Sequence, residues 1–181
     1  MFYNKCQNCS LNGRPRVHGQ LGAKKQLVFI GEAPGYDEVK LGAPFVGRAG
    51  KLLDGIFAEL GIDRKELYIS NSCICHPIDD NGKNRRPTIE EIACCNDRLM
   101  ESIKRINPKV VVALGAVALY ALAESEPLDV IRMKSYVGTE LKSKNGYLLI
   151  PTYHPSYLLR SGEARGIAVE HIRIAYGIAQ I

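Results

Sequence analysis

The fold is decided by the stretch Leu27-Val28-Phe29-Ile30-Gly31-Glu32-Ala33-Pro34-Gly35, an apolar run that ends in a loop of glycine and proline. Such a run is typical of a buried strand, and parallel α/β sheets bind ligands outside the carboxyl ends of their strands. A second tight turn, Pro44-Phe45-Val46-Gly47, follows nine residues later. Glycine lets backbone N–H groups approach a ligand, and Phe45 offers a flat apolar face. The two loops suit a planar ligand such as a nucleobase, although an ordinary strand–helix connection also uses such glycines.

Composition bounds the class of protein. The chain has 181 residues, 46% hydrophobic and 24% charged, which fits one globular domain with a sizeable core. The net charge of +5 suits a surface that binds polyanions, but many proteins without such a partner are as basic. No apolar run reaches the ~20 residues of a membrane span, and the first residues lack the apolar core of a secretory signal. We therefore expect a cytoplasmic protein whose thiols stay reduced.

Six cysteines fall in three groups along the chain: Cys6 and Cys9, Cys73 and Cys75, and Cys94 and Cys95. The first group has the C-x-x-C spacing that lets two thiolates converge on one metal centre. A redox dithiol uses the same spacing, but this pair precedes every predicted strand–helix unit. We expect a metal or iron–sulfur site that joins the N-terminal tail to the body, with incidental or disulfide-bonded cysteines as the alternative.

Predicted strands alternate with predicted helices. Apolar, β-branched runs predict strands at 26–30, 67–70, 110–114 and 147–150. Helical patterns cover 49–60, 88–106, 115–125 and 167–181, with 160–166 leading into the last. Thr88 and Glu91 resemble a capping box at the start of the second helix. This order predicts a parallel sheet covered on both faces, without repeats or a domain boundary, and 77–86 is expected to be a polar loop.

Three polar motifs follow predicted strands. Gly31 to Glu38 follows the first strand, Asn71 the second, and His154-Pro155-Ser156 the fourth. Taken singly, Asn71 is typical of a turn and His154 of a structural histidine. Because the carboxyl ends of parallel strands meet at one rim, we expect the motifs to form one pocket with an aromatic face, an amide and an imidazole.

These motifs, with Pro44-Phe45-Val46-Gly47-Arg48-Ala49-Gly50 and Cys75, resemble the family 4 uracil-DNA glycosylases, which are bacterial and archaeal enzymes that carry a [4Fe–4S] cluster. The resemblance runs from Cys6 to about Arg160, most of the chain. It implies a three-layer α/β/α sandwich around a four-stranded parallel sheet, formed by residues 1–181 as one domain. It also implies a DNA repair enzyme, expected to be a monomer, that hydrolyses the N-glycosidic bond of uracil in single- or double-stranded DNA and leaves an abasic site.

The resemblance assigns roles in the pocket. Phe45 would stack on the flipped uracil, Asn71 would bind its polar edge, and His154 would hydrogen-bond its oxygen as negative charge builds there. The first loop, through Gly31 and the backbone of Glu32 and Ala33, would bind the base and position the attacking water. Glu38 would line the same pocket. These residue types suit the task, because base flipping costs a few kcal/mol, aromatic stacking recovers about 1–3 kcal/mol, and an amide both donates and accepts hydrogen bonds.

Further residues would contact the DNA. Leu158 and Leu159 would wedge into the base stack, with ordinary core packing as the alternative, because periodicity does not assign two adjacent leucines. Ser156 and Arg160 would contact phosphates. Arg86, in a loop that also carries Lys83 and Arg85, is a further candidate, with a solvated loop as the alternative.

The cluster ligands implied by the resemblance are Cys6, Cys9, Cys75 and Cys95. Cys73 and Cys94 compete with their neighbours, because a shift of one helical residue turns a thiol by about 100°. Four thiolates also suit zinc, whereas the resemblance implies iron. Since the cysteines fall away from the pocket motifs, we expect the cluster to be structural.

Two features bear on the details of the site. The loop 78–84 is longer and more acidic than the family's usual segment. Ala33 stands where the wider superfamily often has an acid that activates water, and the absence of that acid is normal in this family. The first loop is therefore expected to place the water rather than activate it, with Glu32 and Glu38 as the candidate catalytic carboxylates that assist. Alternatives are a glycosylase for hypoxanthine or mismatched thymine, a non-catalytic metal-stapled DNA-binding module, and an electron-transfer protein with an exposed cluster.

Overall fold

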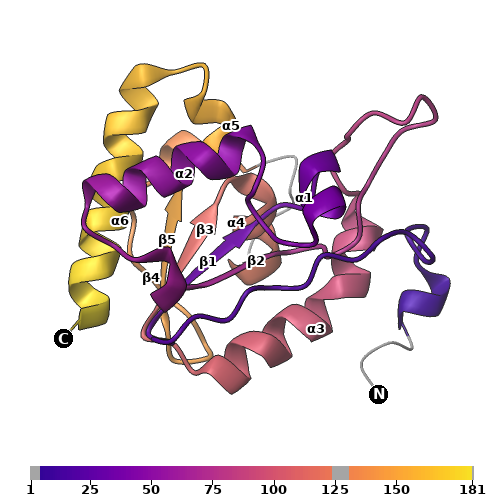
Figure 1. Cartoon of the computed structure of the whole chain (residues 1–181). Coiled ribbons are helices and arrows are strands. Elements are labelled where there is room, and N and C mark those ends of the chain that lie inside the picture. The colour runs from indigo at the N-terminus through magenta and orange to yellow at the C-terminus, as the bar shows by residue number, and fades with distance from the viewer. Residues whose placement is uncertain (1–4, 124–130, 181) are drawn as a thin grey trace.

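The structure, a computed structural model, describes residues 5–123 and 131–180 and is built around one five-stranded sheet (Figure 1). The strand order is β2-β1-β3-β5-β4. The strands are β1 (Leu27–Gly31), β2 (Tyr68–Asn71), β3 (Val110–Leu114), β4 (Leu141–Lys142) and β5 (Leu148–Thr152). Four of them run parallel, and β4 pairs antiparallel with β5 at one edge. The four predicted strands are confirmed to within two residues. The predicted strand count is wrong, because the two-residue β4 is too short to show a periodicity.

Helices cover both faces of the sheet, which confirms the three-layer α/β/α architecture (Figure 1). In β1, Phe29 packs with the side chains of α2 (Arg48–Glu59) and α6 (Gly162–Gln180). Val28 and Ile30 face the opposite layer, formed by α3 (Ile89–Ile106) and α4 (Ala116–Ala123). Burial on both faces explains why β1 and β3 are apolar throughout rather than alternating.

The predicted helix boundaries differ from the structure in specific places. The predicted capping box opens α3, since Thr88 Oγ1 accepts from the N–H of Glu91 at 3.3 Å and the Glu91 carboxylate accepts from that of Thr88 at 2.8 Å. The last helix begins at Gly162, five residues before its predicted start. Residues 124–125 and 181 of the predicted helices lie outside the described residues.

Short helices complete the chain and gave no sequence signal, because one or two turns carry little periodicity. They are α1 (Tyr36–Leu41), α5 (Pro155–Leu158) and the 3₁₀ helices η1 (Lys5–Asn8), η2 (Arg64–Glu66) and η3 (Met133–Ser135). Both α helices of this group stand where a strand has just ended, α1 after β1 and α5 after β5. Within the described residues, no helix is long and apolar enough to cross a membrane.

The sheet topology itself places a site. The chain leaves β1 toward β2 on one side, and later pairs β3 with the other side of β1. The direction of winding therefore reverses beside β1, and open α/β sheets bind ligands in the crevice at such a point.

Candidate active site

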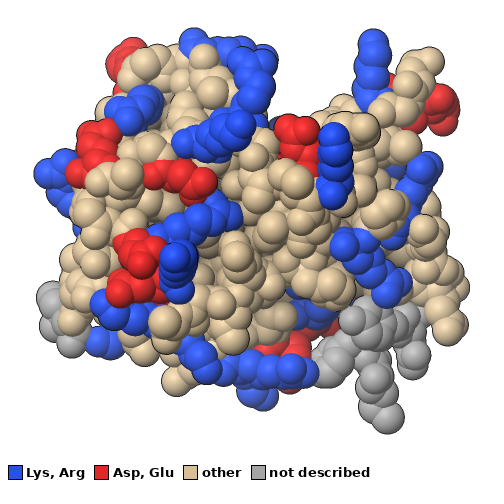
Figure 2. Space-filling view, in the orientation of Figure 1, with Lys and Arg blue, Asp and Glu red and all other residues tan. Residues whose placement is uncertain are grey.

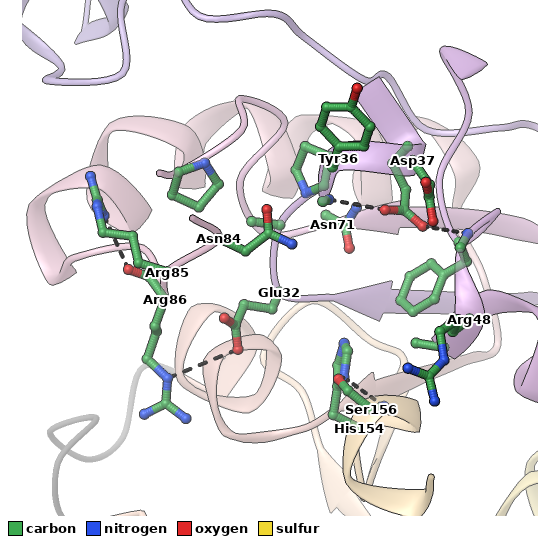
Figure 3. Close-up of a pocket in the computed structure, with 18 of the residues that line it drawn as sticks. Glu32, Tyr36, Asp37, Arg48, Asn71, Asn84, Arg85, Arg86, His154 and Ser156 are labelled. Atoms are coloured by element: carbon green, nitrogen blue, oxygen red, sulfur yellow. Dashed lines mark hydrogen bonds and ion pairs between the residues drawn. The ribbon is translucent and has the colours of Figure 1, made fainter. Parts of the chain in front are cut away.

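An open cavity of about 500 Å³ lies beyond the carboxyl ends of β1, β2 and β5 (Figure 3). Glu32, Phe45, Asn71 and His154 all line it. The three motifs that follow strands therefore meet at one rim, as their sequence positions predict. Two further walls come from α1 and from the loop 77–86.

Gly31 lets the Phe45 ring and the Asn71 amide approach each other. A Cβ atom at position 31 would lie 2.3 Å from Phe45 Cζ and 2.5 Å from Asn71 Oδ1, far inside normal contact distances. The Asn71 side chain is 3% exposed, at the end of β2. An aromatic face and an amide are thus fixed side by side, which is the pair of groups needed to stack on a base and read its edge.

Phe45 is held in an unusual backbone conformation. Its φ of +54° lies in the left-handed region, which is uncommon for a bulky residue. Arg64 clamps the turn by donating to the carbonyl oxygens of Pro44 at 2.6 Å and Phe45 at 3.3 Å. Gly50 lets α2 pack against the same turn, since a Cβ there would lie 1.9 Å from Phe45 O. Strain of this kind concentrates at functional sites, where the surrounding structure enforces it.

The Glu38 carboxylate joins the two loops that the sequence singles out. One oxygen accepts from the N–H of Gly35 at 3.1 Å. The other accepts from the N–H groups of Val46 at 3.1 Å and Gly47 at 2.8 Å. Both carboxylate oxygens are therefore occupied by backbone amides. Glu38 therefore braces the Phe45 turn, whereas the sequence made it a candidate to line the pocket and to assist the attacking water.

His154 enters the cavity from the N-cap position of α5 (Figure 3). Its Nδ1 accepts a hydrogen bond from the N–H of Ser156 at 3.2 Å and also contacts the Ser156 hydroxyl. Burial lowers the pKa of His154 to about 4, and the nearby Glu38 and Arg86 charges act in opposite directions on it. The imidazole is therefore neutral near pH 7, and because Nδ1 accepts, its proton is on Nε2. A neutral N–H donor is presented beside the Phe45 ring, whose centroid lies 5.9 Å from that of His154.

The opposite wall of the cavity carries Glu32, Asn84 and Arg86 (Figure 3). Burial raises the pKa of Glu32, and Arg86, whose Nε lies 3.9 Å from Glu32 Oε2, opposes this shift. The Oδ1 atom of Asn84 lies 2.7 Å from His76 Nε2, which fixes the orientation of the amide. Sequence reasoning missed Asn84. It treated 77–86 as a polar loop and could not show that Ile78 and Asn84 pair across it, which folds the loop toward the cavity.

The residues expected to contact DNA differ in how far solvent reaches their side chains. Leu158 is 4% exposed and belongs to the core. The prediction that it wedges into the base stack is therefore wrong, and the alternative of ordinary core packing is confirmed. Leu159 is 41% exposed and lines the mouth of the cavity. Ser156, Arg160 and Arg86 are also exposed. Figure 2 shows lysine and arginine side chains on both sides of the hollow that lies between the α2 and α6 side of the molecule and the loop 77–86.

The cysteines gather where η1 packs on α3. An ion pair of 2.7 Å between Lys5 and Asp97 joins these two elements. Cys9 packs against a small core cluster that consists of Leu11, Ile74 and Cys75. Burial raises the pKa of Cys6, with contributions from Cys95 and Cys9, and likewise raises that of Cys75, with Cys95 and Cys6 contributing. The four thiols named by the resemblance are therefore mutual neighbours contributed by three chain segments.

The other two cysteines lie at the margins of this group. Cys73 is fully buried in the core and donates a hydrogen bond to Cys95, the main cause that lowers the pKa of Cys95 to about 6. Cys94 contacts Cys9. In the described parts of the chain, no three His, Cys, Asp or Glu side chains are placed to ligate a single metal ion. Each cysteine of a four-iron cluster binds a different iron atom, so a cluster requires wider sulfur spacing than zinc does.

Comparison with known proteins decides the family. The family model of the uracil DNA glycosylase superfamily matches residues 18–173. A type-4 uracil-DNA glycosylase of Thermotoga maritima is 42% identical over 94% of this chain and 88% of its own length. The corresponding protein of Archaeoglobus fulgidus is 36% identical over 88% of this chain and 81% of its own length. The chain belongs to the type-4 uracil-DNA glycosylases.

Membership of this family confirms the resemblance drawn from the sequence and excludes the non-enzymatic alternatives. A type-5 uracil-DNA glycosylase of Pyrobaculum aerophilum is also similar, but it is 28% identical over 80% of this chain and 58% of its own length. The type-4 relatives match at higher identity and over more of their length.

Proposed function

We propose that this enzyme removes uracil from DNA by hydrolysing the bond between the base and C1′ of the deoxyribose. The observation that carries the proposal is the neutral His154, whose Nδ1 is occupied by the Ser156 N–H so that Nε2–H faces the cavity. When the C1′–N1 bond breaks, its electron pair passes to uracil, and the negative charge spreads to the ring oxygens. A fixed donor at such an oxygen typically contributes a factor of about 10²–10³ to the rate.

Phe45 and Asn71 select the base. Uracil must leave the duplex to reach the cavity, and stacking on the Phe45 ring offsets part of the cost of flipping. The Asn71 amide then donates to the O4 carbonyl of uracil and accepts from its N3–H. Cytosine carries an amino group and an unprotonated N3 at these positions, so it presents the opposite pattern.

The attacking water needs a place on the side of the sugar away from the departing base. Glu32, Asn84 and Arg86 are the polar groups on the wall opposite His154 (Figure 3). The oxygens of Glu38 are occupied by backbone amides, and Ala33 has no polar side chain. We assign the water to the Glu32–Asn84 wall. The water oxygen bonds to C1′, one water proton passes through solvent to the departing uracil anion, and the products are neutral uracil and an abasic site.

The mouth of the cavity is the proposed DNA surface. Leu159 is the one leucine of the predicted wedge that solvent reaches. Ser156 and Arg160 flank it, and Arg86 stands on the other side of the cavity. These groups are suited to contact phosphates on either side of a flipped nucleotide.

We propose that Cys6, Cys9, Cys75 and Cys95 hold a [4Fe–4S] cluster. The chain fits the group in two ways. Thiolates are the ligands that such clusters require, and the buried Nε–H of Arg98, beside this site, has no hydrogen-bond partner among the described residues. The cluster would join the N-terminal tail to α3 and the segment after β2, and its role would be structural. A brown preparation that absorbs near ~400 nm would support the cluster, and a colourless anaerobic preparation would contradict it.

The activity is tested with a uracil-containing oligonucleotide followed by alkali, which cuts the strand at abasic sites. We expect cleavage in single- and double-stranded substrate and none when thymine replaces uracil. Absence of cleavage in both uracil substrates would overturn the proposed function. Equal cleavage at hypoxanthine or mismatched thymine would instead favour the broader enzyme.

A further inference from the structure

Arg98 lies between the cysteine site and the base pocket. It stands on α3, three residues after Cys95, so the two side chains share one face of the helix. Its Nη2 donates to the backbone carbonyls of Asn71 at 2.9 Å and Ser72 at 3.1 Å. Nη2 of Arg98 therefore fixes the backbone of Asn71, whose side-chain amide is proposed to bind the base.

The other edge of the guanidinium faces the thiols. Arg98 Nε is buried without a hydrogen-bond partner in the described part of the chain, and leaving a charged donor unpaired in this way is costly. Arg98 lies close enough to Cys95, Cys73 and Cys6 for its charge to interact with all three sulfur atoms. An anionic sulfur site beside Arg98 would supply the acceptor that this edge lacks.

The segment 71–75 belongs to both sites. Asn71 lines the cavity, whereas Cys75 lies in the cysteine group two residues after Cys73. Between them, the N–H and hydroxyl of Ser72 both donate to Gly31 O at 2.9 Å. Cys73 N–H donates to Glu32 O at 3.0 Å. A shift of this segment would therefore move residues of the first loop as well as Asn71.

We propose that Arg98 is a positioning residue that couples the cysteine site to uracil recognition, holding the Asn71 backbone with one edge and donating to the sulfur site with the other. The proposal rests on the proposed function and on a cluster bound by the cysteines. Losing the sulfur partner would leave Arg98 less constrained and loosen Asn71. Losing Arg98 would remove a hydrogen bond and a positive charge from the cluster, which tunes its reduction potential.

The test uses Arg98→Gln in the cluster-loaded protein, with Arg105→Gln as the matched control. Arg105 is on the same helix, and its guanidinium pairs with Glu101 at 3.2 Å on an exposed surface. The first readout is the ratio of dissociation constants for two oligonucleotides with a non-hydrolysable nucleotide, one bearing uracil and one cytosine. The second readout is the reduction potential of the cluster, measured by voltammetry in the absence of DNA.

We expect Arg98→Gln to reduce the preference for uracil about tenfold, which corresponds to about 1.4 kcal/mol, and to shift the potential to a more negative value. Arg105→Gln should change neither. Arg98→Lys keeps the charge but cannot reach both partners, so both shifts should have the same sign and be smaller. If Arg98→Gln folds poorly, both readouts are measured on Arg98→Lys instead.

A change in only one readout would overturn the coupling, since it would make Arg98 a brace for a single site. An unchanged pair of readouts would overturn it as well. Failure of the unmodified protein to prefer uracil would overturn the proposed function, and that result is distinguishable because the potential is measured without DNA.

Discussion

The Nδ1 atom of His154 accepts a hydrogen bond from the backbone N–H of Ser156 at 3.2 Å, and this contact fixes which ring nitrogen carries the proton. Pro155 between them occupies the first position of α5, where its missing N–H costs nothing. The tight turn thus converts a histidine at a strand end into an oriented neutral donor. The catalytic role assigned to His154 follows from this geometry and from its burial.

Replacing His154 with alanine should lower kcat by about 10²–10³ without loss of the cluster. The reason is that the donor for the departing uracil disappears, whereas the cysteine site lies elsewhere in the fold. Single-turnover kinetics on a uracil oligonucleotide measure the effect, and visible absorbance reports the cluster. A wild-type rate would remove His154 from the mechanism, and loss of colour would show that it is structural.

Activity should fall in acid as His154 becomes protonated. Burial disfavours the charged imidazole and lowers its pKa to about 4, so the neutral form prevails at higher pH and is lost as the pH falls through about 4. Protonation of Nδ1 would also break the hydrogen bond from Ser156, because two N–H donors would then face each other. The single-turnover rate should therefore have an acid limb near pH 4. An acid limb near pH 6.5, the ordinary pKa of histidine, would show that burial does not set the pKa of His154.

Glu91 should be a principal source of stability. Its carboxylate is 1% exposed and accepts from Arg85 at 2.6 and 2.8 Å, from Ser10 and from the Thr88 N–H. Breaking a buried pair of this kind costs about 3 kcal/mol, so Glu91→Gln should lower the free energy of unfolding by roughly that amount. Denaturant titration measures it, and the exposed Glu90→Gln is the control. Equal effects of the two substitutions would contradict the prediction.

The same carboxylate should make stability depend on pH. The Arg85 hydrogen bond lowers the pKa of Glu91 to about 2, below the ordinary 4.5. A lowered carboxyl pKa stabilises the folded state above about pH 4.5, and this stabilisation is lost as the pH falls toward 2. The unfolding free energy of the natural chain should therefore fall more steeply across this window than that of Glu91→Gln. Parallel pH profiles would show that Glu91 does not supply the effect.

The cysteine ligands are tested by serine substitution. Replacing Cys75 or Cys95 should abolish the brown colour and lower the iron content per chain, because each removes a proposed ligand. Cys73→Ser and Cys94→Ser are the matched controls, one residue or two away, and should retain iron. Iron retained in Cys75→Ser but lost in Cys73→Ser would transfer the ligand role to Cys73.

Sequence reasoning reached the central sheet and the convergence of the pocket motifs, because both depend on local patterns. The apolar run before Gly31 identifies a buried strand, and Asn71 and His154 each follow another. It could not reach contacts between distant segments. Periodicity does not encode how distant segments pack. It therefore could not predict that Glu38 accepts from the Phe45 turn, that Asn84 reaches the cavity, or that Leu158 is buried.

The most direct test of the central claim is to supply a uracil oligonucleotide in water enriched in heavy oxygen and to analyse both products by mass spectrometry. We expect free uracil without the label and an abasic strand that carries one labelled oxygen at C1′ before exchange, trapped by rapid reduction. The same strand with cytosine in place of uracil should remain intact. An intact uracil strand, or label in the released base rather than the sugar, would contradict the account.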